Sequence, residues 1–250
     1  MKSLIIQAAK EAGKIQLKRF GKIKFVKTKD KKSYFTNVDL ECEKIIINSI
    51  RKKFPKHNII SEESAKIDNQ SDYTWYIDPL DGTHNYIKGF PLFGVSIGLE
   101  RKGKMKFGVI NLPFFKEIYF AEKGKGAFLN GKKIKVSDNK DLKKSLIITD
   151  MSLRDRGDII IEILNKLRGN SYDMRSFGCA VYGYTSVAKG NADIYYTTYT
   201  HPWDVAAGAL IVEESNGKVT GFKGEPWHPN NKKFVASNKK IHNKILKIIK

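Results

Sequence analysis

Residues 75–91 read WYIDPLDGTHNYIKGFP, and the interpretation of the whole chain starts from this stretch. An apolar run typical of a buried strand ends at Asp78, and after a proline a second aspartate follows three residues later, at Asp81. Two carboxylates at the end of a strand are unexpected in a chain whose formal net charge is +20. The sequence therefore raises the question of what gathers acidic groups at this point.

The composition is that of a globular chain, and its 250 residues are enough to bury a substantial core. Hydrophobic residues make up 41% and charged residues 29%, and no apolar run approaches the roughly 18 residues that a membrane span needs. Residues 1–20 place apolar side chains at helical spacing between Lys and Glu, which predicts a native helix and not a secretory signal. With Cys42 and Cys179 as the only cysteines, we expect no disulfide framework, and a cytoplasmic location fits.

The positive charge comes from 46 Lys and Arg residues against 26 Asp and Glu residues. Such a balance is compatible with nucleic acid, a membrane surface or an anionic small substrate as partner. Lysine greatly outnumbers arginine and is spread over many short clusters, whereas arginine is the usual residue for bidentate recognition of bases and phosphates. We interpret the lysines as a solvated surface, so a nucleic-acid partner is possible but not favoured.

The first half of the chain is predicted to hold two helices and a series of antiparallel strands. Apolar spacing indicates helices over residues 2–20 and 40–54, joined by a polar, Lys-rich linker over residues 24–39. Short strands within residues 57–64 and 73–82 each end at carboxylates, and Pro79 is expected to end the second one. A meander is predicted from residues 93–100, 107–112 and 117–121, followed by a hairpin over residues 128–136 with Asn130-Gly131 as a type I′ turn.

The second half is predicted to alternate strands and helices. The strands lie at residues 145–150, 172–177 and 192–198, and the helices at residues 158–168, 179–190 and 204–217, the last being the final helix. No linker, internal repeat or low-complexity tract marks a boundary, so we expect a single domain over residues 1–250, built from halves 1–144 and 145–250. This pattern combines α+β and α/β features and predicts stacked α and β layers.

Asp78 and Asp81 have the chemistry of a magnesium site. Mg²⁺ prefers oxygen ligands, and its sites typically combine a few carboxylates with a substrate phosphate. After Asp81, Gly82-Thr83 is able to open a helix whose unpaired backbone N–H groups bind phosphate. Metal ligands and an anion site would then be neighbours in the chain.

Each acidic residue also has a purely structural interpretation. Asp-Pro and Asp-Gly are common turn dipeptides, and the serines of SEES at residues 61–64 are able to cap a turn that leaves Glu62 and Glu63 in water. Asp204 precedes an apolar helix, where aspartate is a routine N-cap. The functional hypothesis depends on the occurrence of all these residues together, and on their order.

In that order, SEES at residues 61–64, WYIDPLDGTHNYIKGFP at 75–91 and HPWDVAAGALIVEESNG at 201–217 resemble the signature of the inositol monophosphatase-like family. The resemblance covers essentially the whole chain, including NVDLECEK, EKGKGAFLNGKKIKVS and RSFGCA. It implies a layered αβαβα sandwich of the sugar phosphatase fold. It also implies a Mg²⁺-dependent, Li⁺-sensitive phosphomonoesterase that forms a homodimer.

The resemblance further implies the metal ligands, as two to three Mg²⁺ ions. Glu62, Asp78 and the backbone carbonyl of Leu80 would hold the first ion. Asp78, Asp81 and Asp204 would hold the second, and a weaker third ion would lie near Glu62. Two such ions are able to activate water and to stabilise a leaving oxygen.

Catalytic groups are implied in the same way. Asp39 and the Thr83 hydroxyl would orient the attacking water and accept its proton, with Glu62 close enough to share that role. The N–H groups of Gly82 and Thr83 would bind the phosphate, and no covalent phosphoenzyme is expected. Residues 22–33 match a Lys-rich loop that closes over the site and attracts an anionic ester.

The implied substrate contacts are Asp81, Gly82, Thr83, Gly178, Cys179, Ala180, Thr197 and Asp204. Thr197 stands where typical inositol monophosphatases have a glutamate that contacts a ring hydroxyl, and a shorter neutral side chain cannot make that contact. Arg175 and the tyrosines of residues 195–203 are candidate selectors of substrate. The alternative is that Arg175 pairs locally and that the tyrosines line the rim.

Three functions follow as hypotheses. The leading one is a phosphomonoesterase for a small sugar or polyol phosphate, inositol 1-phosphate or fructose 1,6-bisphosphate or both. An alternative substrate is 3′-phosphoadenosine 5′-phosphate or histidinol phosphate. An alternative of another class is an RNA-associated regulatory protein that keeps the fold as a scaffold and binds RNA in a salt-dependent way.

Overall fold

The structure is a computed structural model that describes residues 1–23, 26–28, 34–151 and 153–250. A seven-stranded sheet forms its first half, and neighbouring strands in it follow one another in the chain. The strands are β3 (Asn58–Ser61), β4 (Tyr73–Asp81), β5 (Gly94–Arg101), β6 (Lys104–Leu112), β7 (Glu117–Glu122), β8 (Gly126–Leu129) and β9 (Lys132–Lys133). Within this sheet β3 and β4 pair in parallel and the other described pairs are antiparallel, which confirms the predicted meander. Asn130 (φ 48°) and Gly131 (φ 83°) both have positive φ, as a type I′ turn requires.

A five-stranded sheet forms the second half, in the order β11-β10-β12-β14-β13. Its strands are β10 (Leu146–Thr149), β11 (Asp173–Ser176), β12 (Ile194–Thr197), β13 (Gly217–Thr220) and β14 (Phe234–Asn238). β10 runs parallel to β11 and to β12, whereas β14 runs antiparallel to both of its neighbours. The carboxyl ends of β10, β11 and β12 therefore share one edge of the sheet with the beginning of β14.

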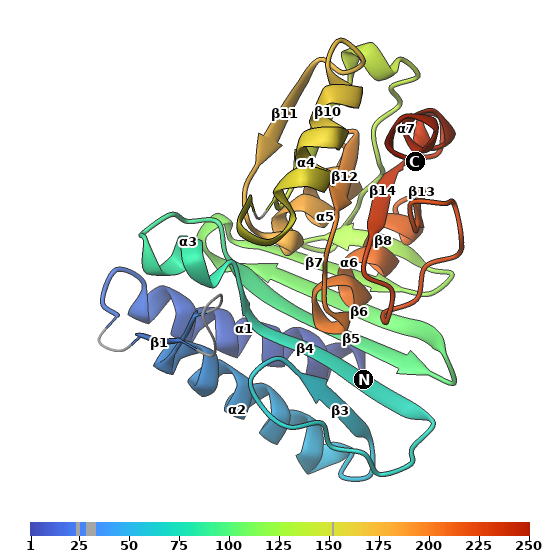
Figure 1. Cartoon of the computed structure of the whole chain (residues 1–250). Helices are drawn as coiled ribbons and strands as arrows, with labels where there is room; N and C mark the ends of the chain where they lie inside the picture. Colours follow the sequence, from blue (N-terminus) through green and yellow to red (C-terminus); the bar gives the residue numbers. More distant parts are fainter. Residues whose placement is uncertain (24–25, 29–33, 152) are drawn as a thin grey trace.

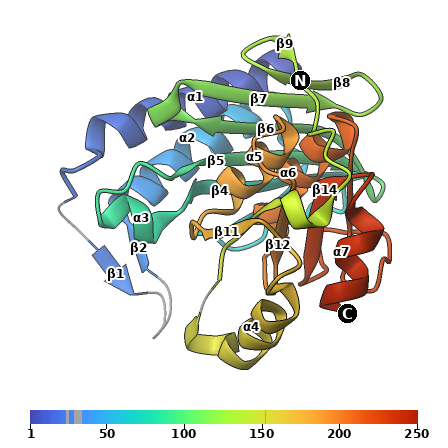
Figure 2. The ribbon, with the colours of Figure 1, turned by 90° about the horizontal axis from the view of Figure 1, so that it is seen from above.

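Helices fill the three remaining layers (Figures 1 and 2). The outer face of the seven-stranded sheet is covered by α1 (Lys2–Arg19) and α2 (Asn37–Lys53). Between the two sheets lie α5 (Ala180–Ala188) and α6 (Pro202–Glu214). The outer face of the five-stranded sheet is covered by α4 (Leu153–Leu167) and α7 (His242–Ile249). Three buried apolar clusters occupy the interfaces between these layers. The predicted αβαβα sandwich is confirmed. Shorter elements are β1 (Val26–Thr28), β2 (Tyr34–Thr36) and α3 (Thr83–Ile87). No helix in the described ranges is both long and apolar enough to cross a membrane.

Several boundaries differ from the prediction for physical reasons. Strand β4 does not end at Pro79 but continues to Asp81, with an irregularity in its pairing between Asp78 and Asp81. The buried Gln16 of α1 makes this possible, because its amide donates to the carbonyls of Pro79 (2.8 Å) and Gly94 (3.3 Å). The predicted polar linker before residue 40 ends earlier than expected, since Thr36 caps α2 and the helix begins at Asn37.

The end of the chain was also predicted wrongly. α6 is not the final helix and ends at Glu214, because Gly217 opens strand β13. β14 and α7 follow, although the tail looked like one more lysine cluster. Ile245, Leu246 and Ile249 are the signal for α7, since they bury one face of the helix between its lysines.

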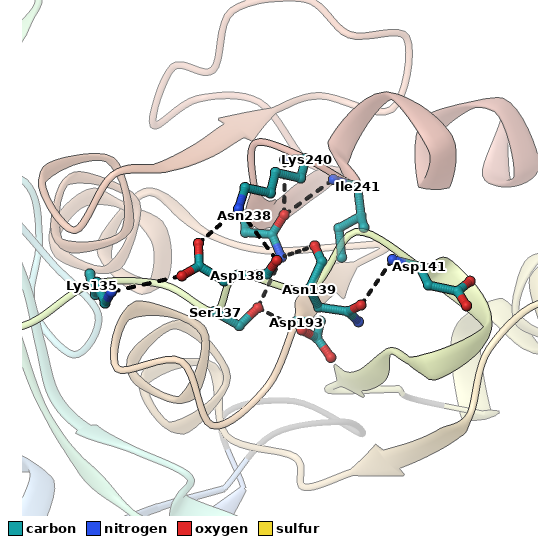
Figure 3. A network of polar contacts seen from close by, with 9 residues as sticks. All are labelled: Lys135, Ser137, Asp138, Asn139, Asp141, Asp193, Asn238, Lys240 and Ile241. Carbon is teal, nitrogen blue, oxygen red and sulfur yellow. Dashed lines mark hydrogen bonds and ion pairs between the residues drawn. The ribbon is translucent and has the colours of Figure 1, made fainter.

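A network of polar contacts stabilises the chain segment that connects the two sheets (Figure 3). The Asn238 amide at the end of β14 donates to the Ser137 hydroxyl (2.9 Å) and to the Asn139 carbonyl (3.1 Å), while its oxygen accepts from two backbone N–H groups that follow it. Ser137 in turn donates to Asp193 at 2.6 Å. Because these buried and partly buried partners satisfy one another, we interpret the network as structural.

We expect His242, which is fully buried at the start of α7, to make the protein sensitive to acid. Its ring nitrogens lie 2.9 Å from the Thr220 hydroxyl and 2.8 Å from the Ser237 hydroxyl. Burial lowers the pKa of His242 to about 4. Between pH 6.5 and 4 the unfolded chain therefore binds more protons than the folded one, and about 3 kcal/mol of stability is lost as pH falls through this window.

Urea unfolding between pH 7 and 4 measures this effect by comparing the wild type with His242→Gln. Glutamine keeps a donor and an acceptor but does not titrate. We expect a shallower acid dependence in the variant. Equal pH slopes in both proteins would contradict this role for His242.

Candidate active site

Asp78 and Asp81 are held in the irregular part of β4 by backbone N–H groups. Asp78 is 1% exposed, and its Oδ1 accepts from the Leu80 N–H at 2.9 Å. Asp81 Oδ2 accepts from the Val181 N–H at 2.7 Å and from the Cys179 thiol at 3.2 Å. Both donors belong to the start of α5, where the helix dipole favours a negative charge. The side chain of Asp81 thus joins the two halves of the chain.

Asp204 is brought to the same region by the packing of α6. Helix α6 lies close to the seven-stranded sheet because Gly98 and Gly108 have no side chain there: a Cβ would lie 2.9 Å from Ala206 Cβ at Gly98 and 2.8 Å from the Ala207 carbonyl oxygen at Gly108. Asp204 in the first turn uses Oδ2 as a cap that accepts from the His201 N–H (2.7 Å) and the Thr200 hydroxyl (3.0 Å). The predicted N-cap role of Asp204 is therefore wrong: His201 is the N-cap of α6, and Asp204, three residues later, accepts from its backbone N–H, which orients the carboxylate.

Glu62 follows strand β3, and its backbone N–H donates to the Ile77 carbonyl at 3.2 Å, one residue before Asp78. Glu43 of α2, which the sequence did not single out, fixes the turn by accepting from the Ser61 hydroxyl and from the Glu63 N–H. Because β3 and β4 are parallel, their carboxyl ends meet at one edge. Both strands deliver carboxylates there, as predicted.

The four carboxylates act on one another electrostatically. Burial is the first cause of the raised pKa of Asp78, and the charges of Glu62, Asp81 and Asp204 raise it further. The pKa of Asp204 is raised by burial and then by Glu62 and Asp81. Burial raises the pKa of Asp81 to about 6, although hydrogen bonds from α5 lower it. Three segments, the end of β3, the end of β4 and the start of α6, thus contribute to one acidic region.

The donor set has the chemistry of a hard divalent cation. Asp78, Asp81 and Asp204 each anchor one carboxylate oxygen to a backbone N–H. Within the described part of the chain, no Lys or Arg forms an ion pair with these three aspartates. Nor, among the same residues, does any group of three or more acidic, His or Cys side chains stand close enough to enclose a metal ion. The negative charges of these side chains repel one another, and a bound cation would relieve that repulsion.

Asp39 and Thr83 form a second, adjoining unit. Asp39 Oδ2 accepts from the Thr36 N–H (2.8 Å) and hydroxyl (2.7 Å), and Asp39 Oδ1 lies 3.2 Å from the Thr83 hydroxyl. The same hydroxyl lies 2.8 Å from the Leu80 carbonyl oxygen. Burial raises the pKa of Asp39 to about 6, the hydrogen bonds from Thr36 lower it, and the charge of Glu62 raises it. The two predicted partners of the water are therefore neighbours.

Gly82 is required at its position before α3. Its φ is 80°, and a Cβ there would lie 2.5 Å from the Leu92 carbonyl oxygen and 3.3 Å from Cys179 Sγ. A residue with a side chain would be strained in both respects. Thr83 then begins helix α3, as predicted, so the Gly82 and Thr83 N–H groups lie beside Asp81 in the chain.

The predicted substrate selectors differ in their exposure and in their partners. Thr197 at the end of β12 is 1% exposed, and its hydroxyl donates to the Tyr199 carbonyl at 2.7 Å. Tyr195 and Tyr196 are fully buried core residues, whereas Tyr199 is 42% exposed. Arg175 forms a 2.6 Å ion pair with Asp173, so the local alternative holds for it.

Gly178, Cys179 and Ala180 lie at the start of α5, where the Cys179 thiol donates to Asp81, and their contact with substrate stays a prediction. The closing loop predicted over residues 22–33 lies partly outside the described residues. Its described part includes β1, which pairs with β2. In β2, Tyr34 contacts the His84 ring of α3 at 5.0 Å between centroids.

Asp150 was missed by the sequence analysis. It follows strand β10, receives a 2.8 Å hydrogen bond from the Tyr195 hydroxyl and has a pKa raised to about 6, first by burial and also by the charge of Asp81. SLIITD repeats the pattern of a strand that ends in a carboxylate, and this was the available signal. Asp150 extends the acidic region to the edge of the five-stranded sheet.

Comparisons with known proteins agree with this arrangement. The model of the inositol monophosphatase family matches residues 1–250. A fructose-1,6-bisphosphatase/inositol-1-monophosphatase from Aquifex aeolicus is 38% identical, over 97% of this chain and 92% of the relative. Nus factor SuhB from Pseudomonas aeruginosa is 34% identical, over 100% of this chain and 95% of the relative.

Solved structures show the same similarity. The extragenic suppressor protein suhB from Bartonella henselae has a TM-score of 0.96 and 34% identity, with 100% of this chain and 98% of the other covered. An IMPase/NADP phosphatase complexed with Mg²⁺ and phosphate has a TM-score of 0.86 and 25% identity, with 99% and 94% covered. The chain therefore belongs to the inositol monophosphatase family and is a phosphoric monoester hydrolase.

Proposed function

We propose that this phosphatase hydrolyses a small sugar or polyol phosphate, with Mg²⁺ as cofactor and water as the nucleophile. The observation that supports it best is the acidic region itself. Glu62 follows β3, Asp78 and Asp81 lie in β4 and Asp204 lies in α6, and each of these aspartates has a pKa raised by other carboxylates of the group. A fold gains no stability from such repulsion, so a cationic ligand is the physical reason to keep it.

The proposed ligands of the first ion are Glu62, Asp78 and the Leu80 carbonyl, and those of the second are Asp78, Asp81 and Asp204, with a third ion near Glu62. Bound Mg²⁺ would lower the pKa of water and stabilise the leaving oxygen. The related IMPase/NADP phosphatase that was solved with Mg²⁺ and phosphate supports this choice of cation.

The chain's own groups orient the reactants. Asp39 Oδ1 and the Thr83 hydroxyl, 3.2 Å apart, are proposed to hold the attacking water, and Asp39 to receive its proton. The two hydrogen bonds from Thr36 keep Asp39 in place while this happens. The Gly82 and Thr83 N–H groups are proposed to bind phosphate oxygens. Because water is the proposed nucleophile, hydrolysis requires no covalent phosphoenzyme.

We expect Mg²⁺ to stabilise the protein against heat at neutral pH. The folded-state pKa of Asp81 is raised from 3.8 to about 6, so the folded protein binds a proton at Asp81 more tightly than the unfolded chain does. The stability that this proton contributes to the metal-free protein is lost as pH rises through 6. A cation removes this repulsion, and saturation at 100 times Kd adds about 2.7 kcal/mol. Protons compete with the cation, so the gain should shrink below pH 6. Thermal unfolding with Mg²⁺ or EDTA at pH 5 and 7.5 measures both effects, and an equal Tm with and without Mg²⁺ at pH 7.5 would contradict the site.

A panel of phosphate esters tests the function directly. We expect Mg²⁺-dependent release of phosphate from inositol 1-phosphate, fructose 1,6-bisphosphate or both, and inhibition by Li⁺. Thr197 offers no carboxylate to a ring hydroxyl, and a relative is named for both activities, so fructose 1,6-bisphosphate is the substrate that we favour. Exclusive turnover of 3′-phosphoadenosine 5′-phosphate or histidinol phosphate would instead select the alternative substrates.

A homodimer is proposed as the assembly. Phe114 and Phe115 are 46% and 39% exposed with ring centroids 5.7 Å apart, and Phe115 lies 5.8 Å from the ring of Tyr182. A surface of exposed aromatic rings is typical of protein interfaces. Light scattering measures the mass in solution, and we expect twice the 28.4 kDa of one chain.

A second candidate function is an RNA-associated regulatory role. The name of the Nus factor SuhB relative and the net charge of +20 favour it. This role predicts RNA binding that weakens steeply with salt. It also predicts that binding survives the removal of Mg²⁺, which separates it from the phosphatase activity.

A further inference from the structure

One lysine lies at the sheet edge that carries the acidic region. Strands β12 and β14 are antiparallel, and Thr197 is paired with Phe234. The residues that follow β12 therefore lie beside those that precede β14. This places Lys232, from a distant part of the chain, next to the segment that leads into α6.

Two contacts hold the Lys232 side chain there. Its ammonium group donates to the Thr200 carbonyl at 3.3 Å and lies 5.1 Å from the centroid of the Tyr199 ring. The Thr200 hydroxyl in turn donates to Asp204 Oδ2 at 3.0 Å. A single residue thus links the ammonium group to a proposed metal ligand.

The charge of Lys232 has no structural partner of opposite sign, since no described carboxylate forms an ion pair with it. A cation at this place repels Mg²⁺, so it does not serve metal binding. It attracts an anion that approaches along the sheet edge. The contacts with Tyr199 and Thr200 restrict the side chain beforehand, so less conformational entropy is lost when that anion binds.

We propose that Lys232, held by Tyr199, binds the second phosphate group of a substrate that carries two, and so determines specificity for a sugar bisphosphate over the monophosphate. This inference rests on the proposed function, since the other phosphate is the one that is hydrolysed. Lysine suits the role because its ammonium group is a compact charge with three donors, one of which is directed at Thr200.

Fructose 1-phosphate and fructose 1,6-bisphosphate test the proposal, because they differ only in the second phosphate. We expect Lys232→Gln to raise KM for the bisphosphate about tenfold and to leave kcat, and KM for the monophosphate, unchanged. Lys232→Arg should retain most of the preference, and Tyr199→Ala should lose part of it. Lys233→Gln is the matched control, because Lys233 lies over the Phe222 ring instead, at 5.9 Å.

A salt series adds an independent readout, since the bisphosphate advantage of the wild type should shrink as ionic strength rises. Equal KM changes for both sugars, or no change in Lys232→Gln, would overturn the proposal. If the wild type hydrolysed neither sugar, the proposed function would fail. Calorimetric measurement of the binding of the same two sugars would then still test the role of Lys232. We expect Lys232→Gln to bind the bisphosphate about tenfold more weakly and the monophosphate as tightly as the wild type does.

Discussion

Asp81→Asn is expected to reduce the Mg²⁺-dependent release of phosphate about 10³-fold, which corresponds to roughly 4 kcal/mol of lost transition-state stabilisation. Asparagine has nearly the same shape, and its oxygen is still able to accept from the Val181 N–H that holds Asp81 at 2.7 Å. The negative charge is the property that disappears. Initial rates with inositol 1-phosphate and fructose 1,6-bisphosphate, at several Mg²⁺ concentrations, measure the loss.

Stability separates this effect from damage to the fold. Because burial and Glu62 raise the pKa of Asp81, removal of its charge should raise the Tm of the metal-free protein and abolish the stabilisation by Mg²⁺. Asp68→Asn is the matched control, since Asp68 is exposed and contacts only its chain neighbours Lys66, in an ion pair, and Gln70, whose N–H it accepts. Turnover within tenfold of the wild type in Asp81→Asn would refute the metal assignment.

Asp39→Asn is expected to lower kcat by about 10²- to 10⁴-fold, the usual contribution of a general base. The asparagine oxygen is able to accept both hydrogen bonds from Thr36, so the start of α2 is retained. Stabilisation by Mg²⁺ should also remain, in contrast to Asp81→Asn. Glu41→Gln, a partly exposed position on the same helix that pairs with Arg19, is the control.

The pH profile tests the role of Asp39 itself. The carboxylate is the active form of a base, and the pKa of Asp39 is raised to about 6. At saturating Mg²⁺ the activity of the wild type should therefore rise as pH increases through 6. The activity of Asp39→Asn should no longer rise with pH in this range. An unchanged rise in the variant would show that another group titrates there.

Local pattern predicted most of the elements. Helix α1, the meander of β5 to β7 and the Asn130-Gly131 turn were read from periodicity and turn residues, because each depends on neighbours in the sequence. The failures occurred where distant contacts decide. β4 continues past Pro79 because Gln16 satisfies the carbonyls at the irregularity, and α7 was overlooked because its apolar face stands among lysines.

The sequence by itself determined the identity of the acidic residues, the family and the glycine that must precede α3. The tertiary structure alone decided which charges interact. Burial raises the pKa of Asp78 and Asp204, and Gly98 and Gly108 allow α6 to lie close to the sheet. Asp150 and Lys232 join the same edge through strand pairing that no local pattern reveals. Desolvation and Coulomb interactions depend on distance in space, whereas a sequence motif records only distance along the chain.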